Sequence, residues 1–207
     1  MKFKIKSLSE PLTGLKFKGN RNYLHGTDIL EAGLRVIATR YNTEAITDID
    51  IGFHKRAKTG LTLYSVPPLN KEPTIQLSCK IAGVREKFFL VEDGQEIFER
   101  YDYAEEAIVA ATQIRLDCAS ALSNVALDFT DIERWVAMVK ALHHGLYPEA
   151  SGKWLFVRGK FVRYRGTYGH TAIEHRVTLE ANFNDKFTRS ALVIDGEKLG
   201  DIFFSLD

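Results

Sequence analysis

One stretch organises the fold of this chain: Asn22-Tyr-Leu-His-Gly-Thr-Asp-Ile-Leu-Glu-Ala-Gly-Leu-Arg-Val-Ile37. Its apolar residues recur close to the i, i+3, i+4, i+7 spacing of a half-buried helix. They are Ile29, Leu30, Leu34, Ile37 and Ala38. Thr27 can cap such a helix, and Asp28 and Glu31 follow it into the expected first turn. We therefore predict a polar loop that leads into an amphipathic helix ending near Arg40.

Groups that can do chemistry gather at the start of this helix. His25 and Gly26 lie just before it, and the carboxylates of Asp28 and Glu31 come shortly after. The free backbone N–H groups of a helix N-terminus favour negative charge that develops there. The stretch is therefore a candidate site, although it does not by itself name a reaction.

Length and charge exclude several classes of protein. The 207 residues suit one large domain or two domains of roughly 100 residues each. With 28 basic and 27 acidic residues the net charge is +1, which argues against a dedicated nucleic-acid binder. No apolar run approaches the roughly 18 residues of a membrane helix, and the N-terminus lacks a signal-peptide pattern. Without an export signal we expect a cytoplasmic protein with reduced thiols, and the spacing of Cys79 and Cys118 does not suggest a metal site.

Alternating apolar and polar residues predict strands around the helix. In the first half these are residues 2–7 before the helix, and 47–53, 60–66, 74–79 and 87–92 after it. Asp93-Gly94 is a two-residue hairpin signal that leads into a strand at 96–101. The second half predicts a strand or a helix at 107–118, a helix at 130–143, and strands at 154–157, 161–164, 171–179, 189–194 and 198–206. Asp195-Gly196 forms its closing hairpin.

Two short matches at one offset suggest an internal duplication. Thr27-Asp28-Ile29 opens the first helix, and Thr130-Asp131-Ile132 opens the second one 103 residues later. Leu90-Val-Glu-Asp-Gly-Gln-Glu-Ile97 is matched by Leu192-Val-Ile-Asp-Gly-Glu-Lys-Leu199, 102 residues later. Ordered matches at half the chain length predict two similar units, 1–103 and 104–207.

A strand, one long helix and four or five antiparallel strands ending in an x-Asp-Gly-x hairpin resemble the hotdog fold. The residues 161–206 resemble the closing strands of hotdog dehydratases and thioesterases, and Leu24-His25-Gly26-Thr27 resembles their His-Gly entry to the central helix. Two such units resemble a double hotdog: an α+β protein of two tandem β-α-β4 units, each with an antiparallel sheet wrapped around a central helix. The chain lacks the Pro-Gly turn of the dehydratases and the tandem glycine of many thioesterases. Cystatin-like and other α+β folds are the alternatives.

The resemblance implies a protein that acts on acyl thioesters of coenzyme A or acyl carrier protein, in fatty-acid or polyketide-type metabolism. Coenzyme A or phosphopantetheine would enter only as part of the substrate, with no other cofactor. Gly26 or Thr27 would supply an oxyanion-binding N–H, His25 or Glu31 the acid/base, and Tyr23 a substrate contact. The simpler interpretation of His25 is a loop histidine hydrogen-bonded to a turn, and a first-turn Glu31 stabilises a helix without any chemistry.

The second helix lacks a preceding histidine. Thr130-Asp-Ile-Glu133 fits a capping box, a structural role that we favour. In paired hotdogs, however, the histidine of one unit often meets an acid of the partner's helix. By that resemblance His25 could work with Asp131 or Glu133 in one surviving site.

Arg158 and Arg163 belong to a local basic run that suits either the phosphates of coenzyme A and an acidic carrier protein or solvated strand ends. His143 and His144 end the second helix, where cations are favourable, and His170 and His175 support no metal site. Of the possible activities, we favour a thioesterase because of Glu31, with a dehydratase and a non-catalytic binding or assembly protein as alternatives. The assembly is either a monomeric pseudo-dimer or a homodimer.

Overall fold

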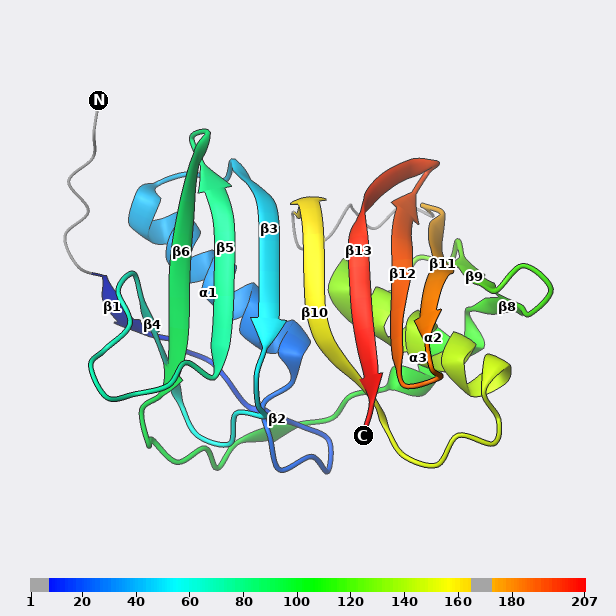
Figure 1. Cartoon of the computed structure of the whole chain (residues 1–207), viewed down its shortest axis with the longest axis horizontal. Coiled ribbons are helices and arrows are strands. Elements are labelled where there is room, and N and C mark those ends of the chain that lie inside the picture. The colour runs from blue at the N-terminus through cyan, green and yellow to red at the C-terminus, as the bar shows by residue number, and fades with distance from the viewer. Residues whose placement is uncertain (1–7, 165–172) are drawn as a thin grey trace. The chain divides into compact units, whose positions relative to one another are not determined.

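The computed structural model describes residues 8–164 and 173–207. Contacts divide the chain into two compact units, Met1–Tyr103 and Ala104–Asp207. Each unit holds an antiparallel sheet and a 16-residue helix, α1 or α3, that lies along its own strands (Figure 1). Within the described residues, no helix is both long and apolar enough to cross a membrane.

The first unit builds its sheet in the order β1-β4-β6-β5-β3, and every neighbouring pair is antiparallel. A separate parallel pair joins β2 to β7. The elements are β1 (Ser9–Pro11), β2 (Phe17–Lys18), α1 (Gly26–Tyr41), β3 (Ile46–Phe53), β4 (Leu61–Tyr64), β5 (Ile75–Ile81), β6 (Val84–Glu92) and β7 (Arg100–Tyr101).

The second unit builds its sheet in the order β10-β13-β12-β11-β9-β8, again antiparallel. Its elements are α2 (Glu105–Ala110), β8 (Gln113–Arg115), β9 (Ser120–Ser123), α3 (Asp131–Leu146), β10 (Trp154–Arg163), β11 (His175–Phe183), β12 (Phe187–Ile194) and β13 (Glu197–Leu206). Both units therefore run strand, helix, strands, but they connect those strands in different orders.

Both predicted long helices are confirmed. The apolar face of α1 is buried, and the Gly33 position on it faces Leu77 of β5 and Leu63 of β4. The helix ends where Asn42 takes a left-handed conformation, with φ 48°. In the second unit Trp135 of α3 is fully buried and stacks on Phe161 of β10, with ring centroids 6.1 Å apart. These apolar stripes against a sheet form the two cores.

The two Asp-Gly pairs have different structures. Asp195-Gly196 joins β12 to β13 with positive φ at both residues, which confirms the predicted hairpin. The hairpin predicted at Asp93-Gly94 is wrong, because β6 ends at Glu92 and no strand follows until β7. The Asp93 carboxylate instead accepts hydrogen bonds from the Thr62 hydroxyl and the Gln95 N–H, at 3.0 and 2.9 Å. The tight hairpin of the first unit is at 82–83, between β5 and β6.

Other elements also differ from expectation. The segment at 107–118 is not one strand but the end of α2, a turn and β8, since Ala and Glu residues favour the helix at its start. The strands predicted at 154–157 and 161–164 are one strand, β10, with a register shift between Phe156 and Arg158. The strand predicted at residues 2–7, the first two residues of the one at 171–179 and His170 lie outside the described residues.

Candidate functional site at the start of α1

Two short strands bring a lysine and a tyrosine to the first turn of α1. The parallel pairing of β2 with β7 sets Lys18 opposite Tyr101. Backbone hydrogen bonds from the Phe17 N–H to the Glu99 carbonyl and from the Gly19 N–H to the Tyr101 carbonyl, both 2.9 Å, hold this ladder. The Lys18 side chain is fully buried, and its ammonium lies 4.2 Å from the ring centroid of Tyr103. A buried ammonium requires partners, which the helix start supplies.

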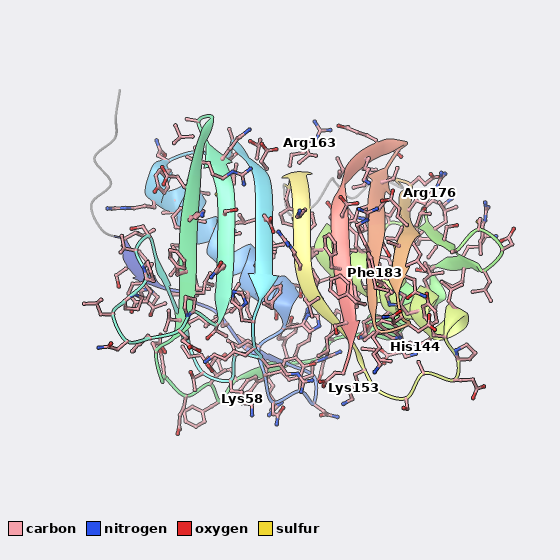
Figure 2. The ribbon with its side chains drawn as sticks, viewed as in Figure 1. Lys58, His144, Lys153, Arg163, Arg176 and Phe183 are labelled. Carbon is pink, nitrogen blue, oxygen red and sulfur yellow. The ribbon has the colours of Figure 1, made fainter. Side chains whose placement is uncertain are left out.

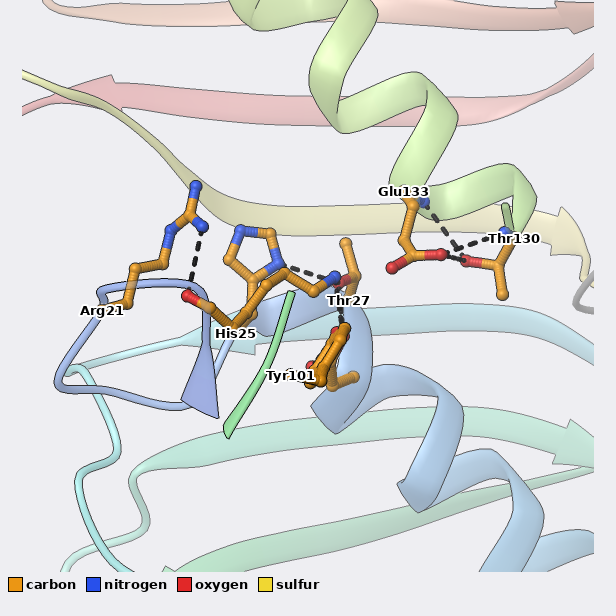
Figure 3. Close-up of polar contacts among 8 residues, drawn as sticks. Arg21, His25, Thr27, Tyr101, Thr130 and Glu133 are labelled. Atoms are coloured by element: carbon orange, nitrogen blue, oxygen red, sulfur yellow. Dashed lines mark hydrogen bonds and ion pairs between the residues drawn. The ribbon is translucent and has the colours of Figure 1, made fainter. Parts of the chain in front are cut away.

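Asp28 is the main partner of this lysine. Its Oδ1 lies 2.9 Å from the Lys18 ammonium and accepts from the Thr27 hydroxyl at 2.9 Å, while its Oδ2 accepts from the Tyr101 hydroxyl at 2.8 Å (Figure 3). These donors and the location of Asp28 in the first turn all favour the ionised carboxylate. Asp28 thus anchors the buried lysine at the start of α1.

His25 joins the same network through Thr27. Its Nδ1 lies 2.8 Å from the Thr27 Oγ1, which also accepts from the Lys18 ammonium at 3.1 Å (Figure 3). The imidazole is only 8% exposed. The structure therefore joins His25, Thr27, Asp28, Lys18 and Tyr101 in one hydrogen-bonded cluster, which we call the α1 network. Lys18 and Tyr101 were not predicted, because no helical or strand periodicity links them to the helix start.

His25 is also the N-cap residue of α1, in an extended conformation with φ −77° and ψ 139°, and no side chain caps the helix. Its carbonyl accepts from the N–H groups of Asp28 and Ile29, both at 3.1 Å. The N–H groups of Gly26 and Thr27 come earlier in the helix, where no intrahelical carbonyl is available. A helix start of this kind suits an oxyanion.

Glu31 and Tyr23 have less definite places. Glu31 is half-buried and lies in the second turn of α1, not in the first, because the helix begins at Gly26. Tyr23 is half-buried, and the guanidinium of Arg56 lies 5.4 Å from its ring centroid. The catalytic role of Glu31 and the substrate contact of Tyr23 stay predictions.

The start of α3 has the capping box that the sequence predicted. The Glu133 N–H donates to the Thr130 Oγ1 at 3.4 Å, and the Thr130 N–H donates to the Glu133 Oε2 at 3.0 Å (Figure 3). The carboxylate of Glu133 is therefore engaged at its own helix end. A catalytic role for Glu133 stays a prediction.

Asp131 follows in the first turn of α3 and has a histidine neighbour that the sequence did not reveal. The Nε2 of His175, at the start of β11, lies 3.7 Å from the Asp131 Oδ1, and both side chains are buried. Burial, with a smaller contribution from the nearby Arg134, lowers the pKa of His175 to about 4. The ring is thus neutral at pH 7, and the contact is polar, not an ion pair. Long-range strand pairing of β11 with β9 creates this neighbourhood, so a local sequence pattern gives no signal for it.

The other basic candidates of the second unit lie along its strands. Arg158 on β10 places its guanidinium 5.9 Å from the ring centroid of Phe203, and Arg163 at the end of β10 pairs with Glu197. Figure 2 labels Arg163 at that strand end. These contacts fit the strand-end interpretation, and phosphate binding stays a prediction.

The expectation of two cationic histidines at the end of α3 is wrong for His143. This side chain is fully buried, its Nε2 lies 3.1 Å from the Thr188 Oγ1, and its ring lies 4.2 Å from that of Trp154. Burial lowers the pKa of His143 to about 4, so the ring is neutral and belongs to the core. His144, which is labelled in Figure 2, is exposed. It borders a pocket of about 590 Å³ between α2 and α3, which has a largely apolar lining and includes the Lys140–Glu105 ion pair. Among the described residues, no cluster of histidine, cysteine or carboxylate side chains suits a metal ion.

Comparison with known proteins now places the fold. No protein-family model matches the sequence, and no curated protein matches it. Among solved structures, a hot dog fold protein of unknown function from Alicyclobacillus acidocaldarius is similar over 100% of this chain and 95% of its own, with TM-score 0.52 and 11% identity. The tesB protein of Mycobacterium avium subs paratuberculosis covers 94% of this chain and 91% of its own, with TM-score 0.52 and 10% identity.

A third similar structure is the dehydratase domain of PpsC from Mycobacterium tuberculosis in complex with C12:1-CoA. The match covers 97% of this chain and 93% of that chain, with TM-score 0.52 and 10% identity. These similarities show that the chain has a hotdog fold. At such low identity the likeness carries the fold alone, so activity has to be argued from the α1 network.

Proposed function

We propose that this protein binds acyl thioesters of coenzyme A or acyl carrier protein and hydrolyses them with His25 as the general base. One observation carries the proposal: a buried imidazole, oriented through its Nδ1 by Thr27, stands at the start of a helix that no side chain caps. A positioned base and backbone oxyanion donors are the two groups that thioester hydrolysis requires. Coenzyme A or phosphopantetheine enters only as part of the substrate.

The proposed reaction uses the chain's own groups throughout. The Nε2 of His25 takes a proton from a water molecule as the water oxygen bonds to the thioester carbonyl carbon. The N–H groups of Gly26 and Thr27 donate to the resulting oxyanion. When the tetrahedral intermediate collapses, the carbon–sulfur bond breaks, and the imidazolium returns the proton to the leaving thiolate. The products are a carboxylic acid and a free thiol.

The second candidate is dehydration of a 3-hydroxyacyl thioester, and a specific similarity favours it. The PpsC dehydratase domain, which is similar in fold to this chain, was solved in complex with C12:1-CoA. In this alternative the Nε2 of His25 removes a Cα proton, and an acid protonates the departing hydroxyl. That acid was predicted to be Asp131 or Glu133, and the prediction stands as part of this alternative.

We further propose that each unit is one hotdog unit. A sheet and a central helix of its own in each unit support this view. The different strand orders and the unequal Asp-Gly turns show that the units are not connected identically.

A panel of acyl-coenzyme A and acyl carrier protein substrates tests the proposal. Free thiol reports hydrolysis, and the enoyl product reports dehydration. Replacement His25→Ala is expected to lower kcat/KM about 100- to 10,000-fold, the usual contribution of a general base. His54→Ala is the matched control, since His54 is an exposed histidine of the same unit, and it should retain full activity.

Each outcome of this panel decides something. Thiol release that depends on His25 supports the hydrolase, and enoyl product that depends on His25 selects the dehydratase. Full activity in His25→Ala removes His25 as the base. Absence of both products, together with absence of acyl-thioester binding, leaves the non-catalytic assembly protein.

A further inference from the structure

We infer that Lys18, acting through Thr27, determines which nitrogen of His25 carries the proton. The inference rests on the proposed function for its use in catalysis, where Lys18 is a positioning residue that does not touch the substrate. The inference itself concerns the tautomer of His25, which can be measured without any substrate.

The hydrogen-bonding capacity of the Thr27 hydroxyl decides the tautomer of His25. A hydroxyl has one proton to donate and two lone pairs to accept with. The Lys18 ammonium, which can only donate, takes one lone pair at 3.1 Å. The Asp28 carboxylate, which only accepts when ionised, takes the proton at 2.9 Å. The lone pair that is left faces the Nδ1 of His25 at 2.8 Å.

It follows that the Nδ1 of His25 has to bring the proton to this contact. In neutral imidazole the protonated nitrogen is a donor and the other an acceptor. The Nε2 therefore presents a lone pair, as a general base requires. The network orients the ring and also selects its basic form.

Lys18 fixes the direction of the Thr27 hydroxyl. Without the ammonium, the Thr27 hydroxyl has a vacant lone pair, and the Asp28 Oδ1 loses its ion-pair partner at 2.9 Å. The hydroxyl proton is then able to turn toward the Nδ1 of His25, which reverses the tautomer. A buried ion pair is a poor source of stability compared with apolar packing. Its presence beside a histidine is therefore consistent with a positioning role.

The support of Lys18 is rigid, which such a role requires. Its backbone lies in the β2–β7 ladder, and its ammonium also faces the ring of Tyr103 at 4.2 Å and that of Tyr101 at 5.5 Å. Aromatic faces attract a cation and exclude water from it. Besides the groups of α1, the ammonium is thus held by Tyr101 on β7 and by Tyr103, two residues further along the chain.

Nitrogen-15 NMR of the full-length protein with labelled histidine tests the inference. The two ring nitrogens of a neutral histidine have distinct shifts, and the His25 signals are assigned by their loss in His25→Gln. We expect the Nδ1–H form in the wild type at neutral pH. Thr27→Val and Lys18→Met should each convert a large part of the population to the Nε2–H form, while Thr27→Ser should retain the wild-type form.

Matched controls separate the effect from general perturbation. Thr62→Val makes the same chemical change at another buried threonine of the unit, and Lys16→Met removes an exposed lysine two residues before Lys18. Neither should change the His25 signals. Should Lys18→Met fail to fold, Thr27→Val and its rescue by serine still decide the matter. An unchanged Nδ1–H form in a folded Thr27→Val overturns the inference.

Enzyme kinetics test the catalytic consequence independently of the NMR measurement. If the proposed hydrolysis is correct, Thr27→Val should lower kcat more than it raises KM and should displace the acidic limb of the pH profile, with recovery in Thr27→Ser. A tautomer that responds to Thr27 in a protein without thioester activity would sustain the inference and defeat the proposed function. Activity that depends on His25, with a tautomer indifferent to Thr27 and Lys18, would do the reverse.

Discussion

The starts of α1 and α3 use the same three residues for different purposes. Thr-Asp-Ile stands at 27–29 and again at 130–132, yet α1 begins one residue before its threonine and α3 one residue after. Thr130 is therefore an N-cap whose side chain holds its own helix. Thr27 is already inside the helix, where its hydroxyl is available to a lysine, a carboxylate and a histidine.

The difference follows from the residue three positions later. Glu133 can reach back to the N-cap N–H and complete a capping box, whereas the corresponding Leu30 is fully buried in the core of the first unit and cannot. With no box to form, α1 starts at Gly26, and His25 takes the N-cap position. The start of α3 is closed by its own side chains, and the polar groups at the start of α1 instead form the α1 network.

Among the replacements that would remove the difference between the two helix starts, we expect Lys18→Met to have the largest effect on the free energy of unfolding. Lys18→Met leaves the Asp28 carboxylate in a largely buried place without its cation, and removal of one partner of a buried pair costs about 3 kcal/mol or more. Urea unfolding should show this loss. Lys16→Met, which removes a surface pair with Glu99, should cost less than about 1 kcal/mol. Equal effects of the two replacements would mean that the α1 network does not hold the first unit together.

How far the sequence predicts this arrangement depends on the range of each interaction. The helices, the capping box at Thr130 and the Asp195-Gly196 hairpin are local patterns, and all three are confirmed. Lys18 and Tyr101 reach α1 through the parallel pairing of two-residue strands, which leaves no periodic trace. The same limit applies to His175, which long-range strand pairing brings to Asp131.

At Asp93-Gly94 the sequence misleads in the other way: a local pattern typical of a hairpin is present, but the hairpin does not form. The dipeptide favours a tight hairpin, but the Asp93 carboxylate is held by Thr62 and Gln95, and the chain leaves the sheet there. Strands β4 and β5 already pair with β6 on its two sides, so a returning strand has no free edge beside it. Tertiary pairing thus overrides the turn preference.

The second expected effect concerns acid, and it distinguishes the two units. His143 and His175 both belong to the second unit, and each has a pKa of about 4 against 6.5 in an unfolded chain. Between these values the unfolded state binds more protons, so stability is intact above pH 6.5 and falls as the pH drops toward 4. Each histidine accounts for a loss of up to about 3 kcal/mol. Hydrogen exchange at pH 7 and pH 5, corrected for the intrinsic rate, should show the core strands β11 to β13 losing protection.

A variant sharpens the acid prediction. Replacing His143 with glutamine removes one titrating group while keeping a hydrogen-bonding side chain near Thr188. This variant should reduce the destabilisation between pH 7 and pH 5 by about half. If the variant and the wild type lose stability equally over that interval, His143 titrates normally and the assignment of acid sensitivity to its burial is wrong.

The smallest effect separates function from structure at His25 itself. Serine at an N-cap accepts from the first-turn N–H groups, which stabilises a helix by about 1 kcal/mol, and His25 provides no such bond. His25→Ser gains that cap and loses the contact with Thr27, a hydrogen bond that contributes about 1 kcal/mol. We therefore expect urea unfolding to change by less than about 0.5 kcal/mol, since the two terms nearly cancel. Thr130→Ala, which removes the existing cap of α3, gives the reference loss of about 1 kcal/mol.

A histidine kept for function is expected to show this near-cancellation. Serine would cap the helix better at that position without loss of stability, so stability alone does not explain the histidine. If His25→Ser instead destabilises the protein by more than about 2 kcal/mol, well beyond the loss in Thr130→Ala, the imidazole is chiefly a structural link between loop and helix. His25 would then resemble the buried His143, and the start of α1 would differ from that of α3 in its means of stabilisation but not in its purpose.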